Sequence, residues 1–244
     1  MLAAMHAELR SLFEHLESAA PDEGTPPAVR GTLGVHPVVV ALTGIGKVAA
    51  ASCAATLIER YRPSAVLFAG LAGSLSPGLR IGDIVVASRF IQYDLDASPL
   101  FPRFEVPLTG LGWFMADPAW SERLRAAAVR AVADLEPDAR VALEAVGAGT
   151  PEVRRGDVAT GDVFVTSAPA RDRVRSLVPE AVCVEMEGAA IAQVCHARGV
   201  PFAACRLISD TANESAPADF EAFVTRVESR LTAAVLLGAL LEPS

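Results

Sequence analysis

Short apolar runs that end in glycine-rich turns organise the first half of this chain. One run covers residues 38–42 and is followed by the turn Thr43–Lys47, and a second covers residues 65–69 and is followed by the turn Gly70–Ser74. An alanine-rich segment that reaches about Tyr61 lies between them. Short apolar runs bounded by turn residues are typical of buried strands, so this order predicts a right-handed α/β crossover with a helix between two strands.

Further apolar runs and one periodic segment predict the remaining elements. Leu9, Leu12, Phe13 and Leu16 recur at helical spacing, which predicts an amphipathic helix over residues 5–19. No repeat or linker divides the chain, so we expect one domain over residues 1–244. We also expect strands at 82–87, 182–184 and 203–207, helices at 118–134, 186–198 and 218–241, a proline- and glycine-rich break at 21–27 and an irregular stretch at 91–113.

Composition excludes several classes of partner. Of the 244 residues 52% are hydrophobic, which is enough for a large core, and the formal net charge is -8. This acidic balance argues against nucleic acid and against an anionic membrane surface as partners. No run reaches the ~18 continuous apolar residues of a membrane span. Residues 1–6 lack the features of a signal peptide, so we expect a cytoplasmic protein.

The cysteines are expected to be reduced core residues. Cys53, Cys183, Cys195 and Cys205 all lie in apolar runs, and none forms a close pair. Their spacing matches no zinc motif, and His196 cannot share a helix face with its neighbour Cys195. We therefore expect neither a metal nor a cofactor.

Two groups of polar residues stand where apolar runs end. Glu185 and Glu187 flank Met186 at the start of a predicted helix, and Arg206 precedes the Ser-Asp pair at 209–210. Charged side chains are rarely buried unless they are paired or used, so these strand ends suggest one polar pocket at the edge of a parallel sheet. Taken singly, Glu187 is equally explained as a first-turn glutamate, and the Ser-Asp pair as a cap or turn.

The two glycine turns let the backbone approach a ligand closely, but neither matches a nucleotide-binding fingerprint. No acidic residue follows the first turn at the Rossmann spacing, and neither turn contains Gly-Lys-Ser/Thr. We expect Lys47 to begin a helix rather than to bind phosphate.

With these pieces in order, the chain resembles the methylthioadenosine/S-adenosylhomocysteine nucleosidases of the nucleoside phosphorylase superfamily over nearly its whole length. The resemblance implies an α/β fold with one layer of mixed, twisted sheet surrounded by helices, and a homodimer. The matching segments are Met5-His6-Ala7-Glu8, Thr43-Gly44-Ile45-Gly46-Lys47-Val48-Ala49-Ala50, Gly82-Asp83-Ile84-Val85-Val86, Gly161-Asp162-Val163-Phe164-Val165, Val184-Glu185-Met186-Glu187 and Ser209-Asp210.

The resemblance further implies hydrolysis of the N-glycosidic bond of 5-substituted adenosines, which gives adenine and a 5-substituted ribose. Such cleavage passes through an oxocarbenium-like ribose, so the base needs an acid, the water needs a base and the ribose needs negative charge. Asp210 is then the acid at N7 of adenine, Glu8 the base for water and Glu187 the ligand of the ribose hydroxyls. The other expected substrate-binding residues are Met186 and Glu185 at the ribose, Arg206 near the water, Ser209 beside Asp210, Phe164 and Val165 at the adenine, and Phe220.

Other interpretations stay open. Without the resemblance, Glu8 is explained as a surface helix residue and Phe164 as a core residue. Phosphorolysis is the main chemical competitor, but phosphorylases of this superfamily hold phosphate with an arginine and a serine where this chain has Phe68 and Leu71. A futalosine-type nucleoside hydrolase and a nucleoside-binding sensor without catalysis are the further alternatives.

The chain also departs from the family pattern. Leu71 replaces a serine that the hydrolases usually keep, and only residues 1–4 precede Met5, so the first strand is nearly absent. Residues 91–107 are long and proline-rich; in the family this region helps to close the pocket for the 5-substituent and meets the partner subunit. The aromatic residues that we expect to be exposed there, at an interface or on a lid, are Phe101, Phe104, Trp113 and Phe114.

Overall fold

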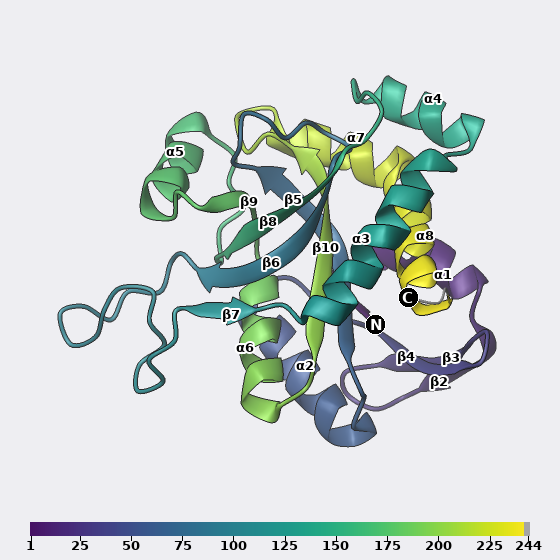
Figure 1. Ribbon diagram of the computed structural model, residues 1–244, viewed down its shortest axis with the longest axis horizontal. Coiled ribbons are helices and arrows are strands. Elements are labelled where there is room, and N and C mark those ends of the chain that lie inside the picture. Colours follow the sequence, from purple (N-terminus) through teal and green to yellow (C-terminus); the bar gives the residue numbers. More distant parts are fainter. Residues whose placement is uncertain (242–244) are drawn as a thin grey trace.

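The computed structural model describes residues 1–241, apart from the side chains of Ala7, Arg226, Glu228 and Ser229, and is built on one 10-stranded sheet (Figure 1). Parallel and antiparallel pairs occur together, which confirms the predicted mixed sheet. The predicted domain extends to residue 244, and its last three residues lie outside the described part. The strands are β1 (Leu2–Ala3), β2 (Glu17–Asp22), β3 (Ala28–Leu33), β4 (His36–Leu42), β5 (Val66–Ser74), β6 (Ile84–Gln92), β7 (Trp113–Met115), β8 (Val153–Thr160), β9 (Ala181–Glu185) and β10 (Phe202–Asp210).

The sheet closes on itself, a feature that the predicted mixed sheet surrounded by helices does not specify. β5 pairs with β10, β10 with β6, β6 with β8, β8 with β9, and β9 again with β5. β5 reaches β9 through Gly73 and Ser74, close to a register shift against β10 between Ile208 and Asp210. Strand twist and bulges curl a sheet in this way, and apolar runs in a sequence carry no record of either. β1, β4, β3 and β2 continue from β5 beside the ring.

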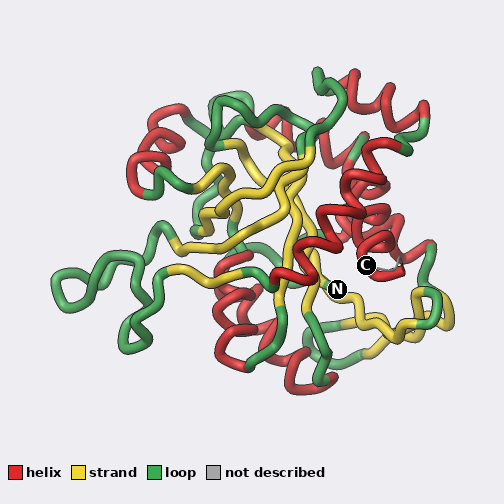
Figure 2. Tube along the Cα trace, in the orientation of Figure 1, coloured by secondary structure: helices red, strands yellow, loops and turns green. Residues whose placement is uncertain are grey.

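Helices cover the sheet from several sides (Figure 2). α2 and α6 lie side by side at the lower end of the ring, and α3 packs against α8 on the right of Figure 1. α2 begins at Lys47, as predicted. The helices are the short 3-10 helix η1 (His6–Leu9), α1 (Arg10–Glu14), α2 (Lys47–Tyr61), α3 (Pro118–Ala133), α4 (Pro137–Ala145), α5 (Ala168–Leu177), α6 (Gly188–Arg198), α7 (Ala216–Arg226) and α8 (Glu228–Leu241).

The central strands are buried on both faces, which explains their continuous apolar sequences. Along β5, Leu67 and Ala69 join the apolar cluster beneath α3 and α8, whereas Val66 and Phe68 join the cluster beneath α2 and α6. The same period of two divides β10. The predicted strands at 38–42, 65–69, 82–87, 182–184 and 203–207 are confirmed as β4, β5, β6, β9 and β10, and the predicted helices at 118–134 and 186–198 as α3 and α6.

The N-terminal helix is shorter than predicted. It ends at Glu14, and Glu17–Asp22 form β2 instead, which pairs with β3 in an antiparallel hairpin. The apolar periodicity is correct for burial, because Leu9, Leu12 and Leu16 are all buried. Leu16, however, contacts the β3 backbone so closely that a Cβ on Gly31 would lie 2.6 Å from its Cγ. Pairing with the next strand along the chain therefore overrides the helical pattern that ends at Leu16.

The predicted closing helix is divided, and several elements follow from no pattern in the sequence. α7 ends at Arg226, Val227 follows as its C-cap, and α8 begins at Glu228. β8 carries charged and polar residues at half its positions, yet it lies in the ring between β6 and β9. Its strand structure comes from these two neighbours. The other elements without a sequence signal are β2, β3, β7, α4 and α5.

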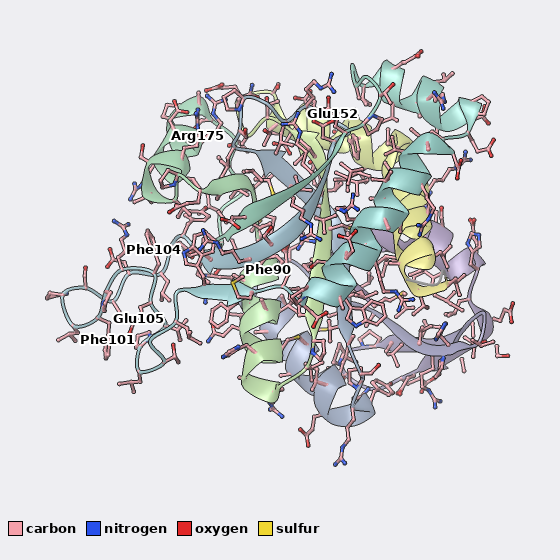
Figure 3. The ribbon with its side chains drawn as sticks, in the orientation of Figure 1. Phe90, Phe101, Phe104, Glu105, Glu152 and Arg175 are labelled. Carbon is pink, nitrogen blue, oxygen red and sulfur yellow. The ribbon has the colours of Figure 1, made fainter. Side chains whose placement is uncertain are left out.

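The exposed aromatic surface predicted after β6 is largely wrong. Phe114 is buried, with its ring against His196, and Phe101, Phe104 and Trp113 are half-buried. Arg89 covers the Trp113 ring at 3.9 Å. The loop between β6 and β7 does project from the body, as the labelled Phe101 and Glu105 show (Figure 3). Its exposed apolar side chains are those of Leu100 and Leu108.

All four cysteines are buried and free, as expected for reduced core residues. Among residues 1–241 no helix combines the length and apolar character needed to cross a bilayer.

Candidate active site

A cavity of about 310 Å³ opens where the ends of β5, β9 and β10 meet the loops after β4 and β8. Every site residue predicted from the sequence lines it except Arg206, which lies behind it. The sheet is not purely parallel at this edge, whereas the sequence suggested a parallel one: β5 lies between β9 and β10 and is antiparallel to β9. The lining residues are Ala4, Met5, Glu8, Ile45, Leu71, Ala72, Gly73, Val163, Phe164, Val165, Val184, Glu185, Met186, Glu187, Ser209, Asp210 and Phe220.

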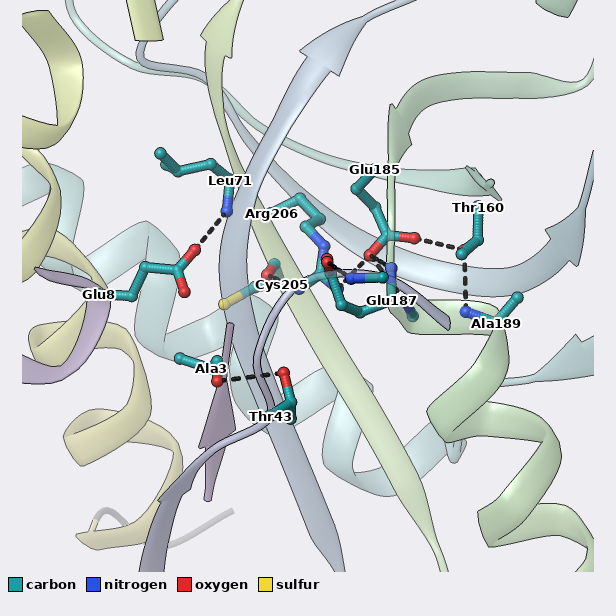
Figure 4. A network of polar contacts seen from close by, with 12 residues as sticks. Ala3, Glu8, Thr43, Leu71, Thr160, Glu185, Glu187, Ala189, Cys205 and Arg206 are labelled. Carbon is teal, nitrogen blue, oxygen red and sulfur yellow. Dashed lines mark hydrogen bonds and ion pairs between the residues drawn. The ribbon is translucent and has the colours of Figure 1, made fainter. Parts of the chain in front are cut away.

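A buried ion pair between Arg206 and Glu185 supports the floor of the cavity (Figure 4). The Arg206 Nη2 donates to Glu185 Oε2 at 2.7 Å, and both side chains are almost fully buried. The guanidinium also lies 4.0 Å from the centre of the Phe68 ring. Phe68 thus supplies a cation–π face beneath the arginine.

Glu185 also holds the start of α6. Its Oε2 accepts the backbone N–H groups of Glu187 (3.1 Å) and Gly188 (2.7 Å), and its Oε1 accepts the hydroxyl of Thr160. With Arg206 added, both carboxylate oxygens are engaged by the protein. This arrangement favours an orienting role for Glu185, and the contact with the ribose stays a prediction.

Glu187 is not a helix-dipole glutamate of the kind that the local sequence would explain. It occupies the N-cap position of α6, but its Oε1 accepts the backbone N–H of Gly46 in the loop after β4, at 2.8 Å. Burial and the neighbouring charge of Glu185 raise the pKa of Glu187 to about 7, although Gly46 N–H and Arg206 act against the shift. A carboxylate with this pKa changes charge near neutral pH.

Glu8 is buried, which contradicts its interpretation as a surface helix residue. Its Oε2 accepts Met5 N–H at 2.7 Å. Its Oε1 accepts Leu71 N–H at 3.3 Å (Figure 4). Burial raises the pKa of Glu8, and the Met5 N–H and the charge of Arg206 oppose this shift. Gly70 makes the close approach to β5 possible, because a Cβ there would lie 2.9 Å from Glu8 Oε1.

Asp210 combines a turn contact with a position on the cavity wall. Its Oδ1 accepts Ala212 N–H at 2.8 Å, which is the turn that the sequence alone suggests, and its Oδ2 accepts the Ser209 hydroxyl at 2.8 Å. Burial raises the pKa of Asp210, opposed by these two hydrogen bonds. The carboxyl group is therefore held in one orientation and biased toward its protonated form.

Two aromatic side chains, those of Phe164 and Phe220, line the cavity. Phe164 is 44% exposed, so it is not a core residue, and its ring meets that of Phe220 edge-to-face at 5.5 Å. Val165 beside it is buried. An exposed aromatic face of this kind can stack on a flat ring such as a purine.

Sequence reasoning missed three contributors to the site. Ile45 lines the cavity although it is 60% exposed, and the adjacent Gly46 supplies the N–H that binds Glu187. Thr160 links Glu185 to the Ala189 N–H of α6. The glycine turn after β4 indicated that Ile45 and Gly46 could lie near a ligand. Nothing in the sequence indicates Thr160, because its place beside Glu185 depends on the pairing of β8 with β9.

No lysine, arginine or histidine is among the residues that line the cavity in the described chain. The described residues also contain no group of three His, Cys, Asp or Glu side chains placed to hold a metal ion. A cavity walled by carboxyl groups suits a ligand that develops positive charge and repels a dianion such as phosphate.

Comparison with known proteins agrees with this chemistry. The model of the phosphorylase superfamily matches residues 1–240. The 5'-methylthioadenosine/S-adenosylhomocysteine nucleosidase of Shewanella pealeana is 34% identical over 245 residues, covering 99% of this chain and 97% of the relative. Among solved structures, the nucleosidase of the same name from Neisseria meningitidis, in complex with methylthio-immucillin-A, has a TM-score of 0.84 at 32% identity, with 98% of this chain and 96% of that chain covered.

A futalosine hydrolase of Helicobacter pylori is also similar, with a TM-score of 0.81 at 28% identity over 98% of this chain and 95% of that chain. The fold is thus shared by hydrolases of both names, while the curated relatives from Shewanella pealeana and Shewanella oneidensis carry the first name. The chain belongs to the methylthioadenosine/S-adenosylhomocysteine nucleosidases of the phosphorylase superfamily.

Proposed function

We propose that this protein hydrolyses the N-glycosidic bond of 5-substituted adenosines such as methylthioadenosine and S-adenosylhomocysteine, giving adenine and a 5-substituted ribose. The observation that carries the proposal is the buried Asp210 carboxyl group, oriented by Ser209, in one cavity with Glu8 and Glu187. The names of the relatives support the same substrates.

In this mechanism each of the three carboxyl groups has a different role. Asp210 donates its proton to N7 of adenine as the bond between N9 and C1' breaks, and its raised pKa keeps that proton available. Water attacks C1', and Glu8 accepts the proton that the water releases. Glu187 binds the ribose hydroxyls and stabilises the positive charge on the ring, with Oε2 as the acceptor because Gly46 N–H engages Oε1.

The remaining residues position the substrate. Phe164 stacks on adenine, the backbone of Val165 binds its edge, and Phe220 supports the Phe164 ring. Met186 lines the ribose side of the cavity. Arg206 acts from behind the wall, where it orients Glu185 and lends positive charge to the group of carboxylates.

The nucleophile is tested by measuring adenine release from methylthioadenosine with and without inorganic phosphate. We expect equal rates and free methylthioribose as the product, because Phe68 is fully buried beneath Arg206 and the cavity lining offers phosphate no cation. A strong rate gain with phosphate, or a ribose 1-phosphate product, would contradict hydrolysis. Faster turnover of futalosine than of methylthioadenosine would assign the chain to the other hydrolase, and binding without adenine release would make it a sensor.

We also propose a homodimer in the cytoplasm. The dimer is supported by the projecting loop between β6 and β7, where Leu100 is 84% and Leu108 is 90% exposed (Figure 3). Among the described residues, none of 91–107 lines the cavity of its own chain, so this loop is free to meet a partner. The four free cysteines support a reducing compartment.

A further inference from the structure

Three loops at the mouth of the cavity meet at one lysine. The Lys47 Nζ lies 2.6 Å from Asp94 Oδ1 and 3.9 Å from Asp162 Oδ2. The backbone N–H of Asp162 donates to the other oxygen of Asp94 at 3.0 Å. Lys47, Asp94 and Asp162 are here called the Lys47 cluster. Lys47 begins α2 directly after the loop that follows β4, and Asp94 and Asp162 lie in the loops that follow β6 and β8. They join segments that are far apart in the sequence.

The Lys47 cluster is linked to Glu187 through the backbone. Lys47 N–H donates to Asp162 Oδ1 at 2.8 Å, and the preceding Gly46 N–H donates to Glu187 Oε1 at 2.8 Å. Two consecutive N–H groups at the start of α2 therefore bind two carboxylates from different loops. Gly46 has a φ of +93°, and a Cβ there would lie 3.1 Å from Asp162 Oδ1, so the approach requires glycine.

We propose that the Lys47 cluster is a positioning device for Glu187: Asp162 fixes the backbone at Lys47, and thereby aims Gly46 N–H at the carboxylate that binds the ribose. This inference rests on the proposed function, since it gives Glu187 its role there. Asp94 holds the lysine and the Asp162 backbone together, so the cluster ties the loop of Ile45 to the loop of Phe164.

The electrostatics of Glu187 supply a readout for this role. Glu187 is faced by Glu185 from β9, Arg206 from β10, Glu8 from η1 and the Gly46 N–H from the start of α2. Gly46 N–H lowers the pKa of Glu187, which is nevertheless about 7. If the N–H moves away, this pKa rises. A larger fraction of Glu187 is then neutral at pH 7, and activity falls first on the acid side of the pH profile.

A purely structural cluster predicts a different result. Solvent-accessible ion pairs contribute little to folding free energy, and the Lys47 and Asp94 side chains are still 17% and 26% exposed. Their loss would change thermal stability slightly and would leave the acid side of the pH profile in place. The two roles are therefore separable by experiment.

The test compares Asp162→Ala with Asp162→Asn, since asparagine keeps an oxygen that can accept Lys47 N–H. The pH dependence of kcat/KM for methylthioadenosine is measured for both, for Lys47→Met, and for Arg125→Met as a control that breaks an exposed ion pair on α3. We expect Asp162→Ala and Lys47→Met to move the acid-side midpoint upward by roughly one unit, the scale of one backbone hydrogen bond to a carboxylate. Asp162→Asn should stay near wild type for this midpoint, and Arg125→Met should not change it.

An unchanged midpoint in Asp162→Ala, or an equal shift in Asp162→Asn, would overturn the positioning role. Failure of the proposed function is distinguishable, because wild-type protein would then release no adenine. In that case the carboxyl carbon of Glu187 is titrated by NMR in ¹³C-glutamate-labelled protein, with Glu187→Gln to assign its signal. A higher pKa in Asp162→Ala than in wild type supports the inference, and an equal pKa rejects it.

Discussion

Glu185 and Glu187 lie two positions apart in sequence and have opposite environments. Glu185 is bound by Arg206, Thr160 and two backbone N–H groups, whereas Glu187 receives one N–H and has its pKa raised to about 7. One glutamate is thus a support and the other is available to a ligand. The sequence predicted that both belong to the site, but the division between them depends on Thr160 and Gly46, which only the folded chain brings near.

The Asp210→Asn variant tests the acid at the residue scale. Asparagine keeps the shape and can still accept Ala212 N–H, but it cannot deliver a proton to N7. We expect turnover of methylthioadenosine to fall by ~100-fold or more, the usual scale for a positioned proton donor. Adenine release is measured together with a thermal melt, which should stay close to that of wild type. Near-normal turnover would make Asp210 a turn residue only and would remove the acid from the mechanism.

At the scale of elements, the local sequence pattern predicted the strands that are buried on both faces. It did not predict the strands that depend on pairing with their neighbours. β5 and β10 are largely apolar because clusters pack on both faces, so their apolar runs are clear in the sequence. The helix predicted over residues 5–19 ends at Glu14, and Glu17–Asp22 form β2, since β3 offers this segment a partner. β8 is charged or polar at half its positions and carries no clear apolar run, yet two neighbours place it in the ring.

The end of β5 packs directly against the proposed acid, Asp210. A Cβ on Gly73 would lie 2.8 Å from Asp210 Oδ1 and 3.2 Å from Ala212 Cβ, so Gly73→Ala must displace the acid or the turn that holds it. We expect kcat/KM to fall by ~100-fold, since displacements of about 1 Å in an active site have effects of that size.

The matched control for this variant is Gly78→Ala, five positions further along the chain and outside the cavity. Its Cβ would lie 3.2 Å from the end of the flexible Arg154 side chain and 3.9 Å from Ser76 Oγ, which is an ordinary contact. Activity and melting temperature of Gly78→Ala should match wild type. Equal activity of both variants would show that β5 does not set the position of Asp210.

At the scale of the whole molecule, closure of the sheet makes the site. Glu8 comes from η1, Glu187 from the end of β9 and Asp210 from the end of β10, and the ring brings these strand ends to one cavity. The identities of these residues were predictable from motifs that resemble a known family. The strand ends also predicted one polar pocket. The ring that forms this pocket was not predictable, because it depends on the register of β5 against both β9 and β10, and no local pattern encodes that register.

The proposed homodimer can be tested through the loop between β6 and β7. If the loop between β6 and β7 forms the dimer interface, a double variant Leu100→Glu and Leu108→Glu places two charges in it, and burial of unpaired charge is strongly unfavourable. Sedimentation equilibrium should give twice the mass of one chain for wild type and a single-chain mass for the double variant. Val35→Glu is the matched control, because Val35 is equally exposed, at 88%, but lies at the turn between β3 and β4. A wild-type monomer would reject the homodimer, and a double variant that stays dimeric would place the interface on another face of the molecule.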